Sequence, residues 1–171
     1  DYIAFLDADD FWLAGKLKAQ LDIHIQNPQV TFSFTDYMHV TEDGESIIGC
    51  FDYWPRFKKV IKQDARVHQF KDFLPLLYAE NMVGTSTVIA KRQTLLDVGG
   101  FDESLKSASD WDLWMKMAVV GEVALLNENT CHYITDRAGA ISRNQSKRLE
   151  AMRHILDKHK PEMARHKGAL N

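Results

Sequence analysis

The sequence predicts an α/β domain, with one sheet flanked by amphipathic helices. Short apolar runs of strand length alternate with helical patterns along the chain. The runs cover 2–6, 30–35, 84–90 and 123–126, and the main helical patterns cover 13–27, 92–98, 109–118 and 145–166. The chain has 171 residues, which is enough for one domain with a sizeable core.

Composition excludes several classes of protein. Hydrophobic residues make up 45% and charged residues 26%, as in ordinary globular proteins. The net charge of −3 gives no general attraction to nucleic acid. Cys50 and Cys131 are the only cysteines, so we expect no disulfide framework and a cytoplasmic setting. No apolar run is long enough to span a bilayer.

The first ten residues contain the strongest functional signal. The apolar run from Tyr2 to Leu6 is followed at once by Asp7, Asp9 and Asp10. We expect the run to be a buried strand of a parallel sheet. Ligands of open α/β sheets bind beyond the carboxyl ends of strands, and carboxylates there suit Mg²⁺ or Mn²⁺. The first hypothesis is therefore a divalent metal at Asp7 and Asp9 that holds a phosphate-bearing substrate.

Three alternatives to this metal site have to be weighed. The acidic residues could form a solvated turn, with Asp10 capping the next helix. A calcium-binding EF-hand loop is excluded, because its sixth and twelfth positions would be Trp12 and Lys18. A phosphohydrolase that forms an aspartyl phosphate on Asp7 remains a minor alternative.

Other local patterns predict the elements that follow. Leu13, Leu17, Leu21 and Ile25 recur at helical spacing and are expected to face the core. Asp43-Gly44 between apolar runs predicts a hairpin. We expect a helix over 69–78 that is interrupted at Pro75, a central strand over 84–90, and two strands over 123–126 and 131–134. The aromatic segment 53–57 either lines an acceptor site or packs on the core.

The segment 109–118 predicts a helix with Ser109 as its N-cap. Asp110 shares a face with Leu113 and Trp114, while Asp112 points roughly the opposite way. The free N–H groups of the first turn stabilise an anion at Asp110. That carboxylate is either a functional group or a second capping residue.

The last helix is predicted to be basic and amphipathic, with eight Lys or Arg against three acids over 143–167. Such a helix either lies on an anionic membrane surface or shows an ordinary solvated face above an apolar stripe. We therefore divide the chain into a domain over 1–144 and a terminal helix over 145–171 that packs on it or trails it.

Three stretches together resemble family 2 glycosyltransferases, which have the GT-A fold. Phe5-Leu6-Asp7-Ala8-Asp9-Asp10 is similar to the family's DxD motif. Residues 85–92 with Gly99-Gly100-Phe101-Asp102-Glu103 resemble the segment that precedes its catalytic helix. Ser109-Asp110-Trp111-Asp112-Leu113-Trp114 resembles the start of that helix.

The resemblance implies transfer of a sugar, usually with inversion, from a nucleotide-diphosphate donor to an acceptor hydroxyl. By match, Asp9 is the metal ligand, Asp7 positions the ribose or the metal, and Asp110 is the base. Thr85, Ser86, Asp102 and Asp112 are expected on the acceptor side. The cofactor is Mg²⁺ or Mn²⁺. The acceptor is expected to be a glycan or a lipid-linked glycan in the synthesis of bacterial surface polysaccharide or lipopolysaccharide.

Two residues depart from the family pattern. Ser109 stands where the family has Glu, and Arg137 stands where many members have His. Arg137 could bind the diphosphate but cannot ligate a metal. These departures favour the alternative that the chain is a non-catalytic module that binds nucleotide sugars or carbohydrate.

The chain also opens inside a strand, without the family's first strands. We therefore expect a partial GT-A fold that corresponds to the later part of a larger domain, with little activity by itself. An incomplete sheet edge invites pairing with a second copy. The expected location is cytoplasmic, at the inner face of the membrane if the last helix binds lipid.

Overall fold

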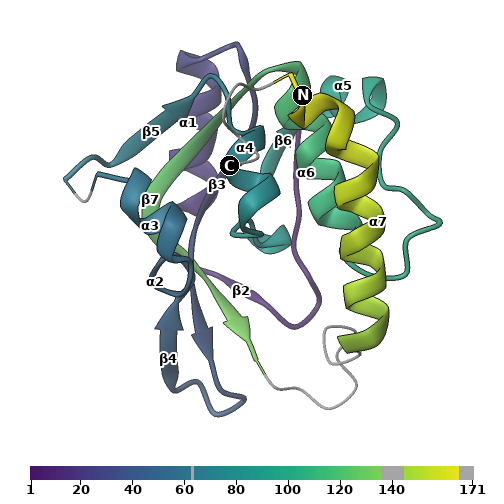
Figure 1. Ribbon diagram of the computed structural model, residues 1–171. Coiled ribbons are helices and arrows are strands. Elements are labelled where there is room, and N and C mark those ends of the chain that lie inside the picture. Colours follow the sequence, from purple (N-terminus) through teal and green to yellow (C-terminus); the bar gives the residue numbers. More distant parts are fainter. Residues whose placement is uncertain (63, 136–144, 166–171) are drawn as a thin grey trace.

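The structure is a computed structural model that describes residues 1–62, 64–135 and 145–165. Within them, seven strands form one curled mixed sheet in the order β1-β6-β3-β7-β2, with β4 beside β3 and β5 beside β7 (Figure 1). The predicted α/β class is confirmed, and the arrangement is consistent with part of a GT-A fold. The strands are β1 Tyr2–Ala4, β2 Phe11–Trp12, β3 Val30–Val40, β4 Ser46–Gly49, β5 Val67–Phe70, β6 Ile89–Lys91 and β7 Glu122–Ile134.

Helices cover both faces of the sheet. Their bounds are α1 Lys16–Gln26, α2 Cys50–Tyr53, α3 Pro55–Val60, α4 Leu74–Ala79, α5 Arg92–Asp97, α6 Ser109–Val120 and α7 Gln145–Met163, with a 3₁₀ helix, η1, at Thr85–Thr87. Side chains on β7 alternate between the two faces. Val123 and Leu125 join the main core with α4 and α6, whereas Ala124 and Leu126 face Ile23 of α1.

The centre of the sheet is the parallel pair β3 and β7. β7 is continuous over the polar residues 127–130, where the sequence predicted a break between two strands. The segment stays extended because its polar groups have partners. Asn129 pairs with Asp36 across a register shift, and the buried hydroxyls of Thr35 and Thr130 lie 2.7 Å apart. The predicted hairpin around Asp43-Gly44 is confirmed by the pairing of β3 with β4.

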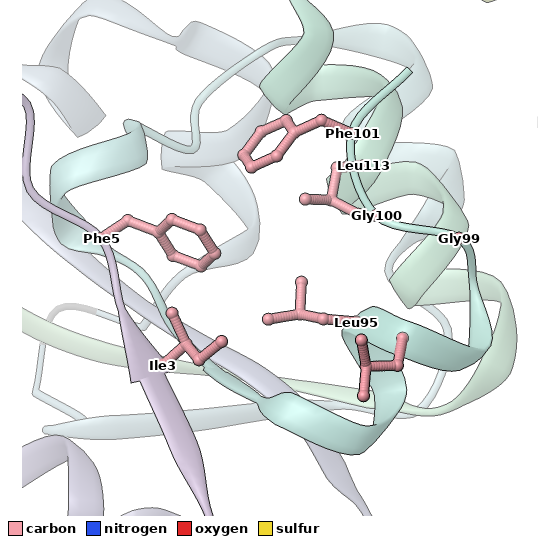
Figure 2. Close-up of a pocket in the computed structure, with 8 residues that line it drawn as sticks. Ile3, Phe5, Leu95, Gly99, Gly100, Phe101 and Leu113 are labelled. Atoms are coloured by element: carbon pink, nitrogen blue, oxygen red, sulfur yellow. The ribbon is translucent and has the colours of Figure 1, made fainter. Parts of the chain in front are cut away.

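β1 differs from the expected buried parallel strand. It runs antiparallel to β6 at the edge of the sheet among the described residues, and Ile3 and Ala4 are exposed. Hydrophobicity alone does not distinguish an edge strand from a central one. Ile3 and Phe5 line an apolar cavity of about 450 Å³ with Leu95, Phe101 and other residues (Figure 2). Among the described residues, no charged side chain lines it, so the part of the cavity that the structure describes lacks the groups of the predicted transfer site.

The core face of α1 was predicted wrongly. Leu17 is 42% and Ile25 is 70% exposed, whereas Lys16, Gln20 and His24 are almost fully buried. The polar side chains are tolerated because they satisfy one another. Lys16 Nζ donates to Gln20 Oε1 at 2.7 Å and lies over the Trp12 ring. Gln20 Nε2 in turn donates to the Ser33 hydroxyl and the Thr87 carbonyl.

His24 makes the folded state sensitive to acid. Its Nε2 lies 3.1 Å from Ser33 Oγ and 3.2 Å from the Ile89 carbonyl oxygen, and burial lowers the pKa of His24 from 6.5 to about 4. Between these values the unfolded chain binds a proton that the folded chain does not. The contribution of His24 to the free energy of unfolding should therefore fall by about 3 kcal/mol as the pH drops through this range.

Urea denaturation across this pH range would measure the effect. The His24→Gln variant should show a shallower loss of stability on acidification than the unmodified chain. His154→Gln is the matched control, because His154 is exposed on α7. If both variants keep the same pH dependence as the unmodified chain, His24 is not the acid-sensitive group.

Three further expectations need correction. Residues 84–90 form η1 and then β6, because Thr87 N and Oγ1 both donate to the Gly84 carbonyl and close a turn. Residues 69–78 span the end of β5 and most of α4, and Pro75 lies in the first turn of α4, where it costs no hydrogen bond. The N-cap of α6 is Ala108, at φ 56°, and not Ser109.

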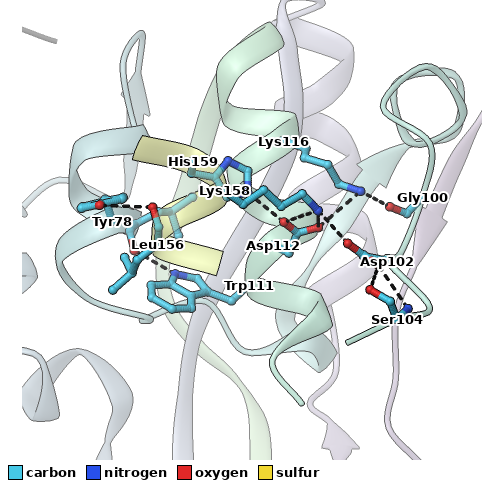
Figure 3. A network of polar contacts seen from close by, with 11 residues as sticks. Tyr78, Gly100, Asp102, Ser104, Trp111, Asp112, Lys116, Leu156, Lys158 and His159 are labelled. Carbon is cyan, nitrogen blue, oxygen red and sulfur yellow. Dashed lines mark hydrogen bonds and ion pairs between the residues drawn. The ribbon is translucent and has the colours of Figure 1, made fainter. Parts of the chain in front are cut away.

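α7 packs along α4 and α6 (Figures 1 and 3). Ile155 and Met163 are fully buried, and the Tyr78 hydroxyl donates to the Leu156 carbonyl. Leu149, which was expected in the apolar stripe, is 60% exposed. Among the described residues, no helix combines the length and apolarity needed to cross a membrane.

Candidate functional site

The acidic residues after β1 form a tight turn. The Asp10 N–H donates to the Asp7 carbonyl at 3.2 Å. Asp7 is exposed and Asp9 is partly exposed, whereas Asp10 is only 7% exposed. Asp7 and Asp9 are therefore the carboxylates of this turn that a ligand can reach, and Asp10 anchors the turn to the protein.

Ser86 of η1 is the anchor point. Its hydroxyl accepts a hydrogen bond from Asp7 N at 3.0 Å and donates to Asp10 Oδ2 at 2.5 Å. The Trp12 indole donates to the Ser86 carbonyl at 2.6 Å. Ser86 was predicted on the acceptor side. The residue is only 2% exposed, and its hydroxyl already bonds Asp7 N and Asp10 Oδ2.

Asp10 is buried at some electrostatic cost. Burial raises its pKa to about 6, against the opposing hydrogen bond from Ser86. Its Oδ1 has no hydrogen-bond partner among the described residues. No local pattern predicts this pairing, because Ser86 is 76 residues away along the chain.

Thr85, the residue before Ser86, holds the candidate base. Thr85 Oγ1 donates to Asp110 Oδ2 at 2.9 Å, and Asp110 is partly buried in the first turn of α6. Desolvation raises the pKa of Asp110, while the Thr85 hydrogen bond, backbone N–H groups and the positive charge of Arg148 oppose this rise. A carboxylate with a raised pKa is better matched to accept a proton near neutral pH.

Asp7 and Asp110 influence each other electrostatically. The pKa of Asp7 is raised first by partial desolvation and then by the negative charges of Asp110 and Asp9. Such crowding of carboxylates favours a cation between them. No three His, Cys, Asp or Glu side chains converge as a metal site in the described parts of the chain. Mg²⁺ in nucleotide enzymes needs only one or two carboxylates with the substrate phosphates, so Asp7 and Asp9 fit such an ion.

Asp102 and Asp112 lie in a separate polar cluster (Figure 3). Asp112 is fully buried, with Lys158 Nζ at 3.0 Å, His159 Nε2 at 2.8 Å and Lys116 Nζ at 3.5 Å. Burial alone would raise the pKa of Asp112, but the hydrogen bonds from His159 and Lys158 hold it below its usual value. Asp102 accepts from Lys158 at 2.8 Å. Both carboxylates therefore tie α7 to the rest of the domain.

The roles assigned to the site residues all remain predictions. Arg137 lies outside the described residues, so the structure does not place it. Thr85 lies next to Asp110, which is compatible with the expectation that Thr85 faces the acceptor. Arg148 of α7, whose charge acts on Asp110, was not predicted as a site residue. In the sequence it is one of many basic residues of that helix and belongs to no motif.

The comparisons with known proteins agree with the resemblance. A profile of the family described as "Glycosyltransferase like family 2" matches residues 1–156. The chain is 26% identical over 161 residues to the Escherichia coli UDP-Glc:alpha-D-GlcNAc-diphosphoundecaprenol beta-1,3-glucosyltransferase WfgD, covering 91% of this chain and 53% of that protein. It is 26% identical over 128 residues to the chondroitin synthase of Pasteurella multocida (strain Pm70), and equally to a hyaluronan synthase of Pasteurella multocida. These two alignments cover 74% of this chain and 11% of each synthase.

The chain thus spans about half the length of the first of these relatives and much less of the other two. The family match, by contrast, extends over most of the chain and includes both the acidic turn and the first turn of α6. The chain therefore belongs to glycosyltransferase-like family 2.

Proposed function

We propose that this chain carries the diphosphate-binding turn and the catalytic base of an inverting glycosyltransferase. The observation that supports this most is the pair Thr85 and Ser86, neighbours in η1 that bond Asp110 and the acidic turn respectively. A donor diphosphate at the turn would then lie on one side of the reacting carbon, and an acceptor hydroxyl at Asp110 on the other.

In this proposal Asp110 takes the proton from the acceptor hydroxyl as that oxygen attacks the sugar. Asp7 and Asp9 hold a divalent ion, Mg²⁺ or Mn²⁺, which as a Lewis acid would stabilise negative charge on the departing diphosphate. Thr85 orients Asp110 through its hydrogen bond. Ser86 and the buried Asp10 keep the turn in place, so that Asp7 and Asp9 do not have to be ordered when the donor binds.

The relatives suggest the class of substrate. The glucosyltransferase WfgD is named for a UDP-glucose donor and a lipid-diphosphate acceptor. We propose a nucleotide-diphosphate sugar as donor and a glycan or lipid-linked glycan as acceptor, in bacterial surface polysaccharide synthesis. The exposed basic residues Arg153 and Lys160 of α7 are compatible with an acceptor presented at an anionic membrane surface.

Transfer should depend on the divalent ion and on sequence beyond this chain. We expect a longer polypeptide, extended to the full length of the matched glucosyltransferase, of which this chain covers 53%, to transfer radiolabelled sugar from UDP-glucose or UDP-N-acetylglucosamine. EDTA should stop the transfer and added Mn²⁺ should restore it. The 171-residue chain should bind UDP·Mn²⁺ weakly by calorimetry and transfer little.

Two variants test the assignment of the turn. Asp9→Asn should weaken binding of UDP·Mn²⁺ strongly, and Asp7→Asn should do so less. Asp43→Asn, in the exposed β3–β4 turn, is the matched control and should change neither binding nor transfer. Equal activity of the short and long polypeptides would contradict the proposed need for further sequence.

A non-catalytic module that binds nucleotide sugars is the second candidate. It is favoured by Ser109, which leaves Asp110 without the neighbouring Glu that the family usually has. Such a module would bind UDP-sugar with Mn²⁺ but show neither transfer nor hydrolysis of the donor, even in the longer polypeptide. The same binding and activity measurements therefore separate the two candidates.

A further inference from the structure

Four aromatic rings gather where β3, β7 and the end of α2 meet. We call Tyr37, His39, Tyr53 and Tyr133 the aromatic platform. The ring of His39 contacts the other three, with centroid distances of 5.0 Å to Tyr37, 5.4 Å to Tyr133 and 6.5 Å to Tyr53. Tyr37 and Tyr133 also lie 5.6 Å apart. The platform is therefore one continuous set of rings built on the paired strands.

The platform differs from the aromatic core beside it. The core rings nearby are phenylalanines such as Phe34, Phe57 and Phe73, which are at most 1% exposed. Every residue of the platform carries a polar group on its ring, and none of the four residues is fully buried. Tyr53 is 60% exposed. Rings with a polar edge that stay partly open to solvent are typical of binding surfaces rather than of core packing.

The platform adjoins the candidate base. A Cβ atom at Gly84 would lie 2.8 Å from Cε1 of Tyr37, so the Tyr37 ring lies directly against the Gly84 backbone. The next residue is Thr85, whose hydroxyl bonds Asp110. Successive Cα atoms are about 3.8 Å apart. A ligand bound on the platform would therefore lie close to any hydroxyl that reaches Asp110.

We propose that the aromatic platform is a subsite for a pyranose ring of the acceptor glycan, next to the sugar whose hydroxyl Asp110 deprotonates. A pyranose presents axial C–H groups on its face, which pack on aromatic rings, while its hydroxyls can bond the O–H group of the exposed Tyr53 and the His39 nitrogen. This inference rests on the proposed function, because it places the sugar by reference to the base.

Saturation-transfer difference NMR on the chain tests the subsite without any donor. The probes are methyl β-D-glucopyranoside and N,N′-diacetylchitobiose. Irradiation of the aromatic protons should transfer saturation to the ring C–H protons of the saccharide. Tyr53→Ala should weaken the apparent affinity about three- to tenfold, and Tyr53→Phe should retain most of it. Phe101→Ala, which removes a 41% exposed ring at the apolar cavity, is the matched control and should have no effect.

A transfer assay on the longer polypeptide separates this inference from the proposed function. Tyr53→Ala should raise the acceptor KM with a smaller change in kcat and no change in the donor KM. An unchanged acceptor KM together with no saturation transfer would overturn the subsite, even where Asp110→Asn abolishes transfer. Saccharide binding that is lost in Tyr53→Ala would support the subsite even in a protein that transfers no sugar, in which case only the proposed function fails.

Discussion

Replacing Asp110 by Asn is expected to lower the rate of sugar transfer by about two to four orders of magnitude, the usual contribution of a general base. Asn has nearly the shape of Asp and can still accept the Thr85 hydrogen bond, so the start of α6 should stay in place. It cannot take a proton from the acceptor hydroxyl. Donor binding, measured as the Kd for UDP·Mn²⁺, should change little because Asp110 does not hold the diphosphate in this proposal.

The pH dependence of transfer gives a second measurement at this residue. Desolvation raises the pKa of Asp110 above 3.8, and a base must be deprotonated to act. The rate should therefore fall as the pH drops through this raised pKa, and the acidic limb of the profile should be lost in Asp110→Asn. Asp97→Asn, an exposed carboxylate at the end of α5, is the control. Turnover that is unchanged in Asp110→Asn would remove Asp110 from the role of base.

Replacing Asp112 by Ala should be the most destabilising of these substitutions. The change leaves Lys158 and Lys116 next to a buried site without the carboxylate that they share, and His159 without its hydrogen-bond partner. Breaking a buried ion pair from one side typically costs about 3–5 kcal/mol. The Lys158 side chain is 33% exposed, so we expect about 3 kcal/mol, the lower end of that range. Urea denaturation monitored by tryptophan fluorescence would measure the loss.

Two comparisons separate this cluster from an ordinary surface ion pair. Asp22→Ala removes the partner of Lys18 in an exposed pair and should cost about 0.5 kcal/mol or less. The double variant Asp112→Leu with Lys158→Met should recover part of the loss, because it removes opposite charges together. The pKa of Asp112 is lowered, so its contribution is present above about pH 4 and lost as the pH falls further. A cost for Asp112→Ala no larger than that for Asp22→Ala would show that the cluster does not hold α7.

Local sequence rules predicted the elements that depend on local chemistry. Asp43-Gly44 specified the hairpin, and Gly99 and Gly100, both at positive φ, directly follow the end of α5, where glycine is favoured. The rules failed where distant partners decide. The leucines of α1 suggested its core face, but the buried face is polar because Ser33 and the Thr87 carbonyl supply hydrogen bonds from far along the chain.

The candidate site shows the same division. The placement of Asp7 and Asp9 after a strand follows from the pattern of residues, and so does that of Asp110 in the first turn of a helix. The partners of these carboxylates do not follow from it. Nothing near Asp112 in the sequence indicates that Lys158 and His159, which are 46 and 47 residues away, form hydrogen bonds with it. Sequence patterns locate charged residues, but the fold decides which of them remain free to act.

The short helix η1 has a consequence for variation among related proteins. Thr85 bonds Asp110 and the adjacent Ser86 bonds the acidic turn. A single peptide unit therefore sets the spacing between these two halves of the site. Loss of either hydroxyl would loosen one half and leave the spacing intact. Insertion or deletion of one residue between Gly84 and Val88 would instead shift one half relative to the other. We therefore expect this segment to tolerate changes of side chain far better than changes of length, unlike an ordinary surface loop.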